Sequence, residues 1–168
     1  PSHFATTYSL LYPIMPFLIL VWLTLTFYAT DFYLPLYPFL VAWTADTCGY
    51  AVGKLCGTHK MCPTISPGKS WEGLLGSLIG VFVMHLWLIP RIHFFSKITL
   101  SFWITVTAFS LVMTVIAFLG GLFLSHLKRK KKLKDAGSVL PGHGGFLDRF
   151  DGVLFVAYAT VLLVIFFK

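Results

Sequence analysis

The chain has 168 residues, of which 57% are hydrophobic, 17% aromatic and only 11% charged. A soluble domain of this length cannot bury so much apolar surface, so the composition excludes an ordinary soluble enzyme and indicates a membrane protein. The net charge of +7 favours anionic lipid head groups and phosphorylated ligands as partners. Nucleic acid is excluded, because the chain offers little soluble face for a basic surface. The three cysteines show no metal-ligand spacing, which excludes a zinc site and a disulfide framework.

Five apolar runs are long enough to cross a membrane. A helix of about 20 residues spans about 30 Å of hydrocarbon, because each residue adds about 1.5 Å. The sequence therefore predicts an all-α, polytopic transmembrane helix bundle that forms a single transmembrane domain over residues 1–168. We expect the spans at 10–30, 33–53, 71–90, 98–124 and 152–167, with the fourth continuing as a solvated helix through the lysines after it. Because the chain begins with Pro1 and not with methionine, we expect further spans upstream in a longer protein.

Basic residues alternate in number between the two sides of this bundle. The loop at 54–70 contains three Lys and the stretch at 125–151 contains seven Lys and Arg, against two at 91–97 and one at the C-terminus. Short cytoplasmic loops carry the excess of Lys and Arg, so both rich segments are predicted to face the cytoplasm. We expect a multi-pass protein of the bacterial inner (plasma) membrane whose active site faces the cytoplasm.

The segment from Lys54 to Ser70 is rich in Lys, Gly, Pro, Ser and Thr, which is typical of an interfacial loop. In the span that follows, Gly73, Gly76 and Gly80 share one face and would allow a neighbouring helix to approach closely.

Residues 66–73 lead from this loop into a helix N-terminus. Such an end is a natural anion site, here with Ser and Lys donors beside it. The same residues could simply form a capped helix start, and capping is the favoured interpretation of Glu72.

Asp46 lies inside the second apolar run. A charge within a span costs about 3 kcal/mol on insertion scales, so we expect this carboxylate to have a partner and a function. The alternative is a protonated or snorkelling side chain near the interface.

Most of the ionisable side chains are concentrated in residues 125–151. Asp148 and Asp151 stand three residues apart at the predicted start of the last helix, which places both carboxylates on one side. Two such charges need a cation, although Asp in a first turn also serves as an ordinary N-cap. Hard divalent cations such as Mg²⁺ prefer carboxylate and phosphate oxygens, and the glycine-rich turn at 141–145 would let backbone amides approach an anion.

Other groups in this stretch are open to two interpretations. Asp135 could be a further metal ligand or a counter-charge to the lysines. His143 could be a base, a phosphate donor or a turn residue, and we favour hydrogen bonding. Most of the lysines at 128–132 are expected only to set topology and to attract anionic lipid.

These residues resemble a known family. The motif Ser-x-Leu-Lys-Arg, followed by Lys-Asp-x-Gly and Leu-Pro-x-His-Gly-Gly-Phe-x-Asp-Arg-Phe-Asp over residues 125–151, looks like the full signature of the phosphatidate cytidylyltransferases, or CDP-diacylglycerol synthases. The blocks at 45–57 and 66–73 resemble two further family motifs, with Gly68 and Ser70 where Lys and Thr are commoner.

The resemblance implies that the chain converts CTP and phosphatidic acid into CDP-diacylglycerol and pyrophosphate in the membrane. It implies Mg²⁺ as cofactor, with room for a second cation that could be monovalent, and a homodimer. Catalysis would fall to Asp148, Asp151, Asp135, Lys69 and His143. Metal would be held by Asp46, Asp148 and Asp151. Substrate phosphates would be bound by Ser66, Ser70, Lys128, Arg129, Lys134, Ser125, Gly144, Gly145 and Arg149.

Other functions fit the same features. A CTP-dependent polyprenol kinase would also act on CTP and a lipid. The CDP-alcohol phosphotransferases place Asp-x-x-Asp at a membrane face, but they require a longer Asp-Gly-x-x-Ala-Arg pattern that this sequence lacks. A non-catalytic membrane scaffold whose basic loop binds anionic lipid is the alternative from another class.

Overall fold

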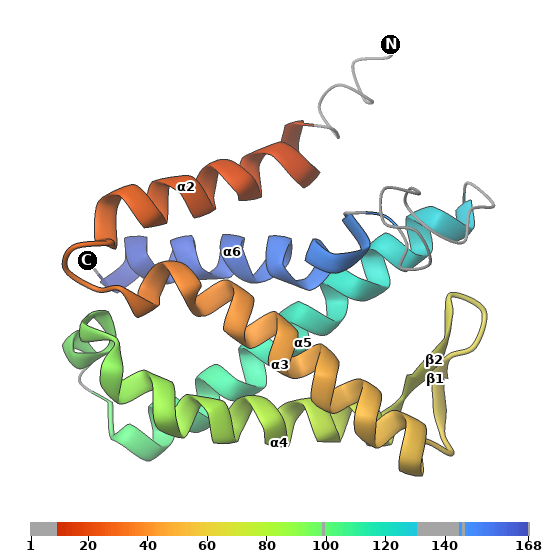
Figure 1. The fold of residues 1–168 in the computed structure, drawn as a ribbon. Coiled ribbons are helices and arrows are strands. Elements are labelled where there is room, and N and C mark those ends of the chain that lie inside the picture. Colours follow the sequence, from red (N-terminus) through yellow and green to blue (C-terminus); the bar gives the residue numbers. More distant parts are fainter. Residues whose placement is uncertain (1–9, 99, 131–144, 146, 168) are drawn as a thin grey trace.

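The computed structural model describes residues 10–98, 100–130, 145 and 147–167. Within them the chain forms a helical turn, five α-helices, a small hairpin and two short helical turns (Figure 1). In order they are η1 (Leu10–Ile14), α2 (Met15–Phe27), α3 (Tyr33–Cys56), β1 (Lys60–Cys62), β2 (Ser66–Ser70), α4 (Trp71–Leu88), η2 (Ile89–Arg91), η3 (His93–Lys97), α5 (Phe102–Lys130) and α6 (Leu147–Phe167). The predicted all-α bundle is confirmed.

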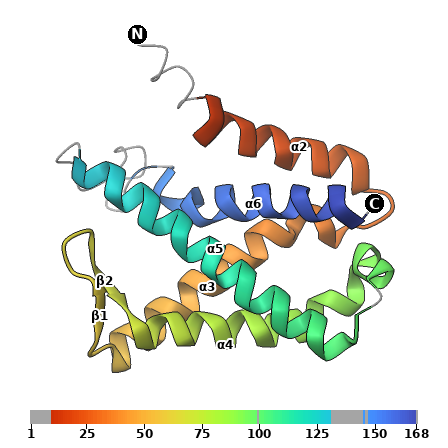
Figure 2. The ribbon, with the colours of Figure 1, turned by 180° about the vertical axis from the view of Figure 1, so that it is seen from behind.

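Helices α3, α4, α5 and α6 pack around a common core, and α2 lies over α6 on the outside (Figures 1 and 2). Tyr37, Val41, Val81, Met113 and Val156 fill that core and are almost completely buried. Much of the outer surface is apolar instead of polar, as on the outward faces of α2 and α6. An apolar outside is what lipid requires of a membrane bundle.

Three helical segments are long and apolar enough to cross a membrane among the residues described: Trp71–Arg91, Phe102–Lys130 and Leu147–Phe167. The apolar helix Tyr12–Phe27 is shorter, and α3 is long but carries charged and small residues. The predicted number of spans and their orientation therefore remain predictions.

The glycine face of the third span packs as expected. A Cβ on Gly76 would lie 2.6 Å from the Val52 side chain, and one on Gly80 would clash with Cys48 Sγ. Only glycine lets α4 approach α3 this closely, so these residues set the distance between the two helices.

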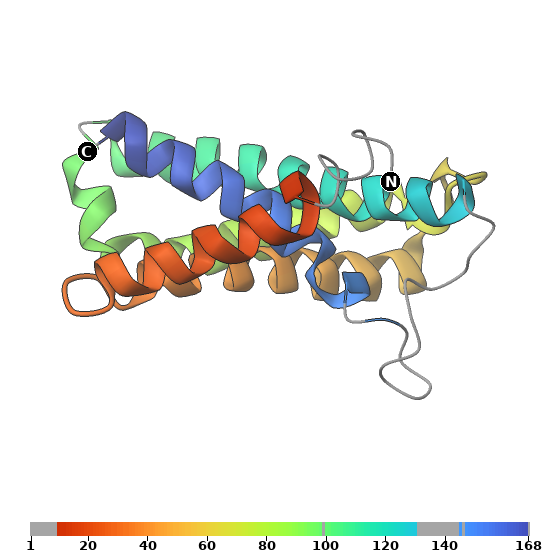
Figure 3. The same ribbon diagram turned by 90° about the horizontal axis from the view of Figure 1, so that it is seen from above.

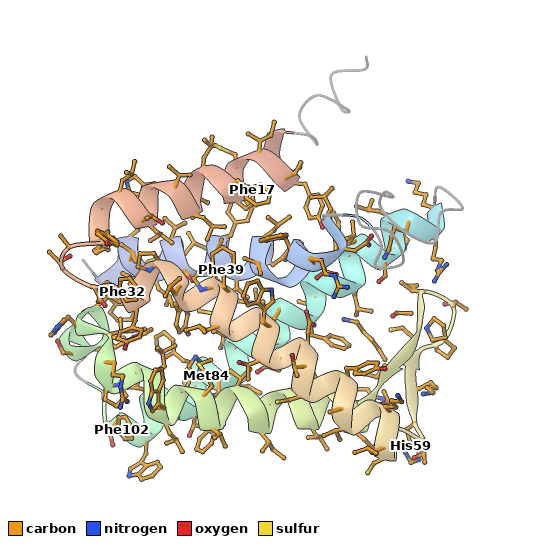
Figure 4. The ribbon with its side chains drawn as sticks, viewed as in Figure 1. Phe17, Phe32, Phe39, His59, Met84 and Phe102 are labelled. Carbon is orange, nitrogen blue, oxygen red and sulfur yellow. The ribbon has the colours of Figure 1, made fainter. Side chains whose placement is uncertain are left out.

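The expected interfacial loop from Lys54 to Ser70 contains regular structure. Helix α3 continues to Cys56, and β1 and β2 pair as an antiparallel hairpin, with Lys60 opposite Ser70 and Cys62 opposite Ser66. The base of the hairpin is bonded to the start of α4, where Trp71 N donates to His59 O at 3.0 Å. In Figure 4, His59 marks this end of the bundle, far from Phe32 and Phe102 at the other end.

The connection at 91–97 is also more ordered than a simple loop. It consists of two short helical turns, and Phe94 and Phe95 are buried in the core. Phe94 N donates to Asp31 Oδ2 at 2.8 Å, so the turn between α2 and α3 is tied to this connection. Seen from above, the connection and the hairpin occupy opposite ends of an elongated bundle (Figure 3).

Candidate active site

A cavity of about 340 Å³ lies at the hairpin end of the bundle. Residues of α3, β2, α4, α5 and α6 line it, so segments far apart in the sequence share one space. Seven of the predicted site residues are among those that line it: Asp46, Ser66, Lys69, Ser70, Ser125, Asp148 and Asp151. The structure therefore brings together the acids, the lysine and the hydroxyls that the sequence places in three separate stretches.

Lys69 reaches into this cavity from β2. Its Nζ donates to the Phe118 carbonyl at 3.3 Å and lies 4.2 Å from the centre of the Phe118 ring. Burial lowers the pKa of Lys69, and the negative charges of Asp46 and Asp151 counteract that shift. Two carboxylates and an aromatic face around the ammonium group favour its charged form, which suits the binding of phosphate oxygens.

Asp46 and Asp151 approach each other from α3 and α6, close enough for their charges to repel. Asp151 Oδ1 accepts the amide of Gly152 at 2.6 Å, and both carboxylates line the cavity. Among the described residues no three Asp, Glu, His or Cys side chains form a complete metal site. Mg²⁺ is usually held by one or two carboxylates together with waters and substrate phosphates, so a repelling pair of carboxylates fits this ion.

Asp148 accepts hydrogen bonds on both of its carboxylate oxygens. Its Oδ1 accepts from Lys128 Nζ at 2.7 Å, and its Oδ2 accepts from Gly145 N at 2.9 Å. Asp148 lies in the first turn of α6, and its second bond satisfies the amide just before that helix. This geometry also fits the alternative in which Asp148 caps the helix. Asp148 thus fixes the start of the helix that carries Asp151.

Helix α4 begins with a side-chain cap. Ser70 has an extended backbone, and its Oγ accepts from Gly73 N at 3.1 Å. The structure therefore shows the capped helix start at Ser70, and this residue also lines the cavity. Glu72 bonds instead to the hairpin base, where Thr58 Oγ1 and His59 Nδ1 lie 2.8 and 2.6 Å from Glu72 Oε1.

Several predicted residues lie elsewhere. The described part of the cavity lining includes neither Arg129 nor Arg149, both of which are exposed, nor Lys128 and Gly145, which hold Asp148. Lys134, Asp135, His143 and Gly144 fall outside the described residues.

Sequence reasoning missed three residues that shape the site. Phe118 supports Lys69, and Gly121 leaves room for its ammonium group, since a Cβ there would lie 2.8 Å from Nζ. Ser77 Oγ donates to the Ala45 carbonyl at 2.6 Å, one residue before Asp46. The sequence signal that could have revealed Gly121 is the pair of glycines at 120 and 121 in an apolar span, because glycine weakens a helix and is expected there only where close packing requires it.

Known proteins resemble the chain over nearly its whole length. Residues 2–167 match the model described as the cytidylyltransferase family. A phosphatidate cytidylyltransferase of Staphylococcus haemolyticus is 39% identical over 142 residues, which cover 83% of this chain and 53% of that protein. The protein of the same name from Staphylococcus aureus strain COL is 39% identical over 130 residues, covering 77% of this chain and 48% of that protein. The chain thus spans about half the length of these relatives, and it belongs to the cytidylyltransferase family.

Proposed function

We propose that the chain carries the catalytic part of a phosphatidate cytidylyltransferase. A phosphate oxygen of phosphatidic acid attacks the α-phosphorus of CTP, the bond to the β-phosphate breaks, and CDP-diacylglycerol and pyrophosphate are formed. The observation that carries the proposal is the single cavity into which Lys69, Asp46 and Asp151 reach from three different elements. The names of the bacterial relatives supply the substrates.

The attacking group needs no strong base. A phosphate monoester is already anionic at neutral pH, because its second pKa is about 6. The difficulty is instead to bring two anions together and to stabilise the charge that develops on the leaving pyrophosphate. Lys69 would bind phosphate oxygens, and the hydroxyls of Ser66 and Ser125 would donate hydrogen bonds to them.

Asp46 and Asp151 would hold Mg²⁺, and when bound the ion would neutralise phosphoryl oxygens of the nucleotide. The two carboxylates fit this task because they converge on one cavity from α3 and α6. Asp148 would act beside them by holding Lys128 and the start of α6. We also propose that this end of the bundle faces the cytoplasm, where CTP is available, and that the protein works as a homodimer.

Transfer of label from CTP separates the candidate functions. The chain, reconstituted with phosphatidic acid and Mg²⁺, is given CTP labelled at either the α- or the γ-phosphate. Cytidylyl transfer puts the α-label into lipid and the γ-label into pyrophosphate. A CTP-dependent lipid kinase, tested with polyprenol, puts the γ-label into lipid. A scaffold binds anionic vesicles and moves neither label, which would overturn the proposal.

A further inference from the structure

One side chain attaches the turn of the β1–β2 hairpin to the end of α5. Arg129 Nε donates to the carbonyl of Ile65 at 3.3 Å, and Ile65 N closes the turn by donating to Cys62 O at 3.2 Å. We propose that Arg129 is a positioning residue, which holds β2, and with it Lys69, along α5, instead of binding a substrate phosphate. The effect on catalysis rests on the proposed function, but the attachment itself can be measured without it.

The hairpin has a second attachment to the same face of α5. Lys69 Nζ donates to the Phe118 carbonyl, and Phe118 precedes Arg129 by 11 residues. Eleven residues make about three helical turns and about 16 Å, so both positions share one face of the helix. The stretch from Ile65 to Lys69 covers about 13 Å when extended. The two lengths are similar, so the two bonds can hold β2 to α5 near both of its ends.

The base of the hairpin is held independently. Trp71 N donates to His59 O, and Glu72 accepts from Thr58 and from the amide of His59. Loss of the Arg129 bond should therefore release the turn without unfolding the hairpin.

The end of α5 holds two walls of the cavity through consecutive residues. Lys128 is bonded to Asp148 at the start of α6, and Arg129 is bonded to the hairpin turn. The last turn of α5 thus sets the position of Lys69 relative to Asp151. Arg129 itself is exposed and lies outside the described lining of the cavity.

Three substitutions separate a hydrogen-bond role from a charge role. Arg129→Gln places an amide nitrogen as many bonds from Cα as the original Nε, so it keeps the donor and removes the charge. Arg129→Met has the same reach and no donor, which makes it the matched control for the glutamine variant. Arg129→Lys keeps the charge but loses the planar guanidinium.

The first readout is the position of the hairpin. Cys62 is half-buried in β1, and Cys56 is exposed at the end of α3. The labelling rates of both thiols by a maleimide are measured by mass spectrometry in the purified, detergent-solubilised chain, with Cys56 as the internal reference. We expect Arg129→Met to raise the ratio of Cys62 to Cys56 labelling by about five-fold. That factor is the change in an equilibrium constant that corresponds to the net contribution of one typical hydrogen bond. Arg129→Gln should leave that ratio near the wild-type value.

The second readout is the transfer of α-label from CTP to phosphatidic acid. A positioning role predicts that Arg129→Met lowers kcat while the KM for CTP changes by less than about two-fold, and that Arg129→Gln restores most of kcat. The proposal is overturned if Arg129→Met leaves the labelling ratio unchanged. It is also overturned if Arg129→Lys is active while Arg129→Gln is not, because charge would then be what matters. If the wild-type chain transfers no label but the labelling ratios follow the prediction, the proposed function fails and the attachment stands.

Discussion

Two adjacent glycines of α5 should respond in opposite ways to the same substitution. A Cβ on Gly121 would lie 2.8 Å from Lys69 Nζ and 3.5 Å from Asp151 Oδ2. A Cβ on Gly120 would lie 2.6 Å from the backbone oxygen of Asp151 and 3.1 Å from Gly152 Cα. Gly121→Ala therefore presses on the mobile tip of a side chain, whereas Gly120→Ala presses on the backbone of α6.

The magnitudes follow from these contacts. To reach an ordinary separation of about 3.5 Å, the Lys69 ammonium must retreat by about 0.7 Å. A misplacement approaching 1 Å in a site of this kind can lower the rate by up to about 100-fold, so we expect Gly121→Ala to lose about 10- to 100-fold in kcat/KM. Its stability should be unchanged or higher, because alanine favours a helix over glycine by about 0.5–1 kcal/mol.

Gly120→Ala is the matched control. Overpacking against a backbone costs about 1–3 kcal/mol, so its melting temperature should fall by several degrees. Label transfer from CTP and thermal unfolding in detergent are measured for both variants. Wild-type kcat/KM in Gly121→Ala, or wild-type stability in Gly120→Ala, would refute the packing on which the site is built.

Three further substitutions test separate parts of the structure. Burial raises the pKa of Asp31, so its contribution to stability is full at acid pH and falls as the pH rises through the folded-state pKa. Asp31→Asn keeps an acceptor for Phe94 and should raise the melting temperature at neutral pH but not below about pH 4, which a pH series of melting curves would show. His85 is buried with Nδ1 2.9 Å from Ser110 Oγ, so His85→Ala should cost about 2 kcal/mol or more with no change in the KM for CTP. Asp148→Asn should abolish label transfer while the protein stays folded in detergent; unchanged activity would remove Asp148 from the site.

The helices could be predicted from the sequence because lipid demands long uninterrupted apolar runs. The glycine face of α4 was predictable for a similar reason, since small residues at spacings of three and four mark close helix contacts. The hairpin could not be predicted. Its second strand, at 66–70, contains Ser, Pro, Gly and Lys and lacks the β-branched alternation that marks a strand, so only its tertiary contacts stabilise it.

The residues that line the cavity were easier to predict than the hydrogen bonds among them. The sequence indicated that Asp46, Lys69 and Asp151 act together, and all three line one cavity. It did not reveal that Asp148 is already bonded to Lys128, or that Arg129 contacts a backbone carbonyl. Such pairings depend on how the end of α5 lies relative to its neighbours, which no local pattern encodes.

The most direct test of the site is the Mg²⁺ dependence of cytidylyl transfer in Asp46→Asn and Asp151→Asn. If these carboxylates hold the ion, each variant should require at least about ten-fold more Mg²⁺ for half of its maximal rate, or lose transfer entirely. Asp31 is a buried acid next to Phe32, at the end of the bundle opposite His59 (Figure 4). Asp31→Asn therefore serves as the control and should keep the wild-type Mg²⁺ dependence. Wild-type rates and wild-type Mg²⁺ dependence in both Asp46→Asn and Asp151→Asn would contradict a shared metal site at this cavity.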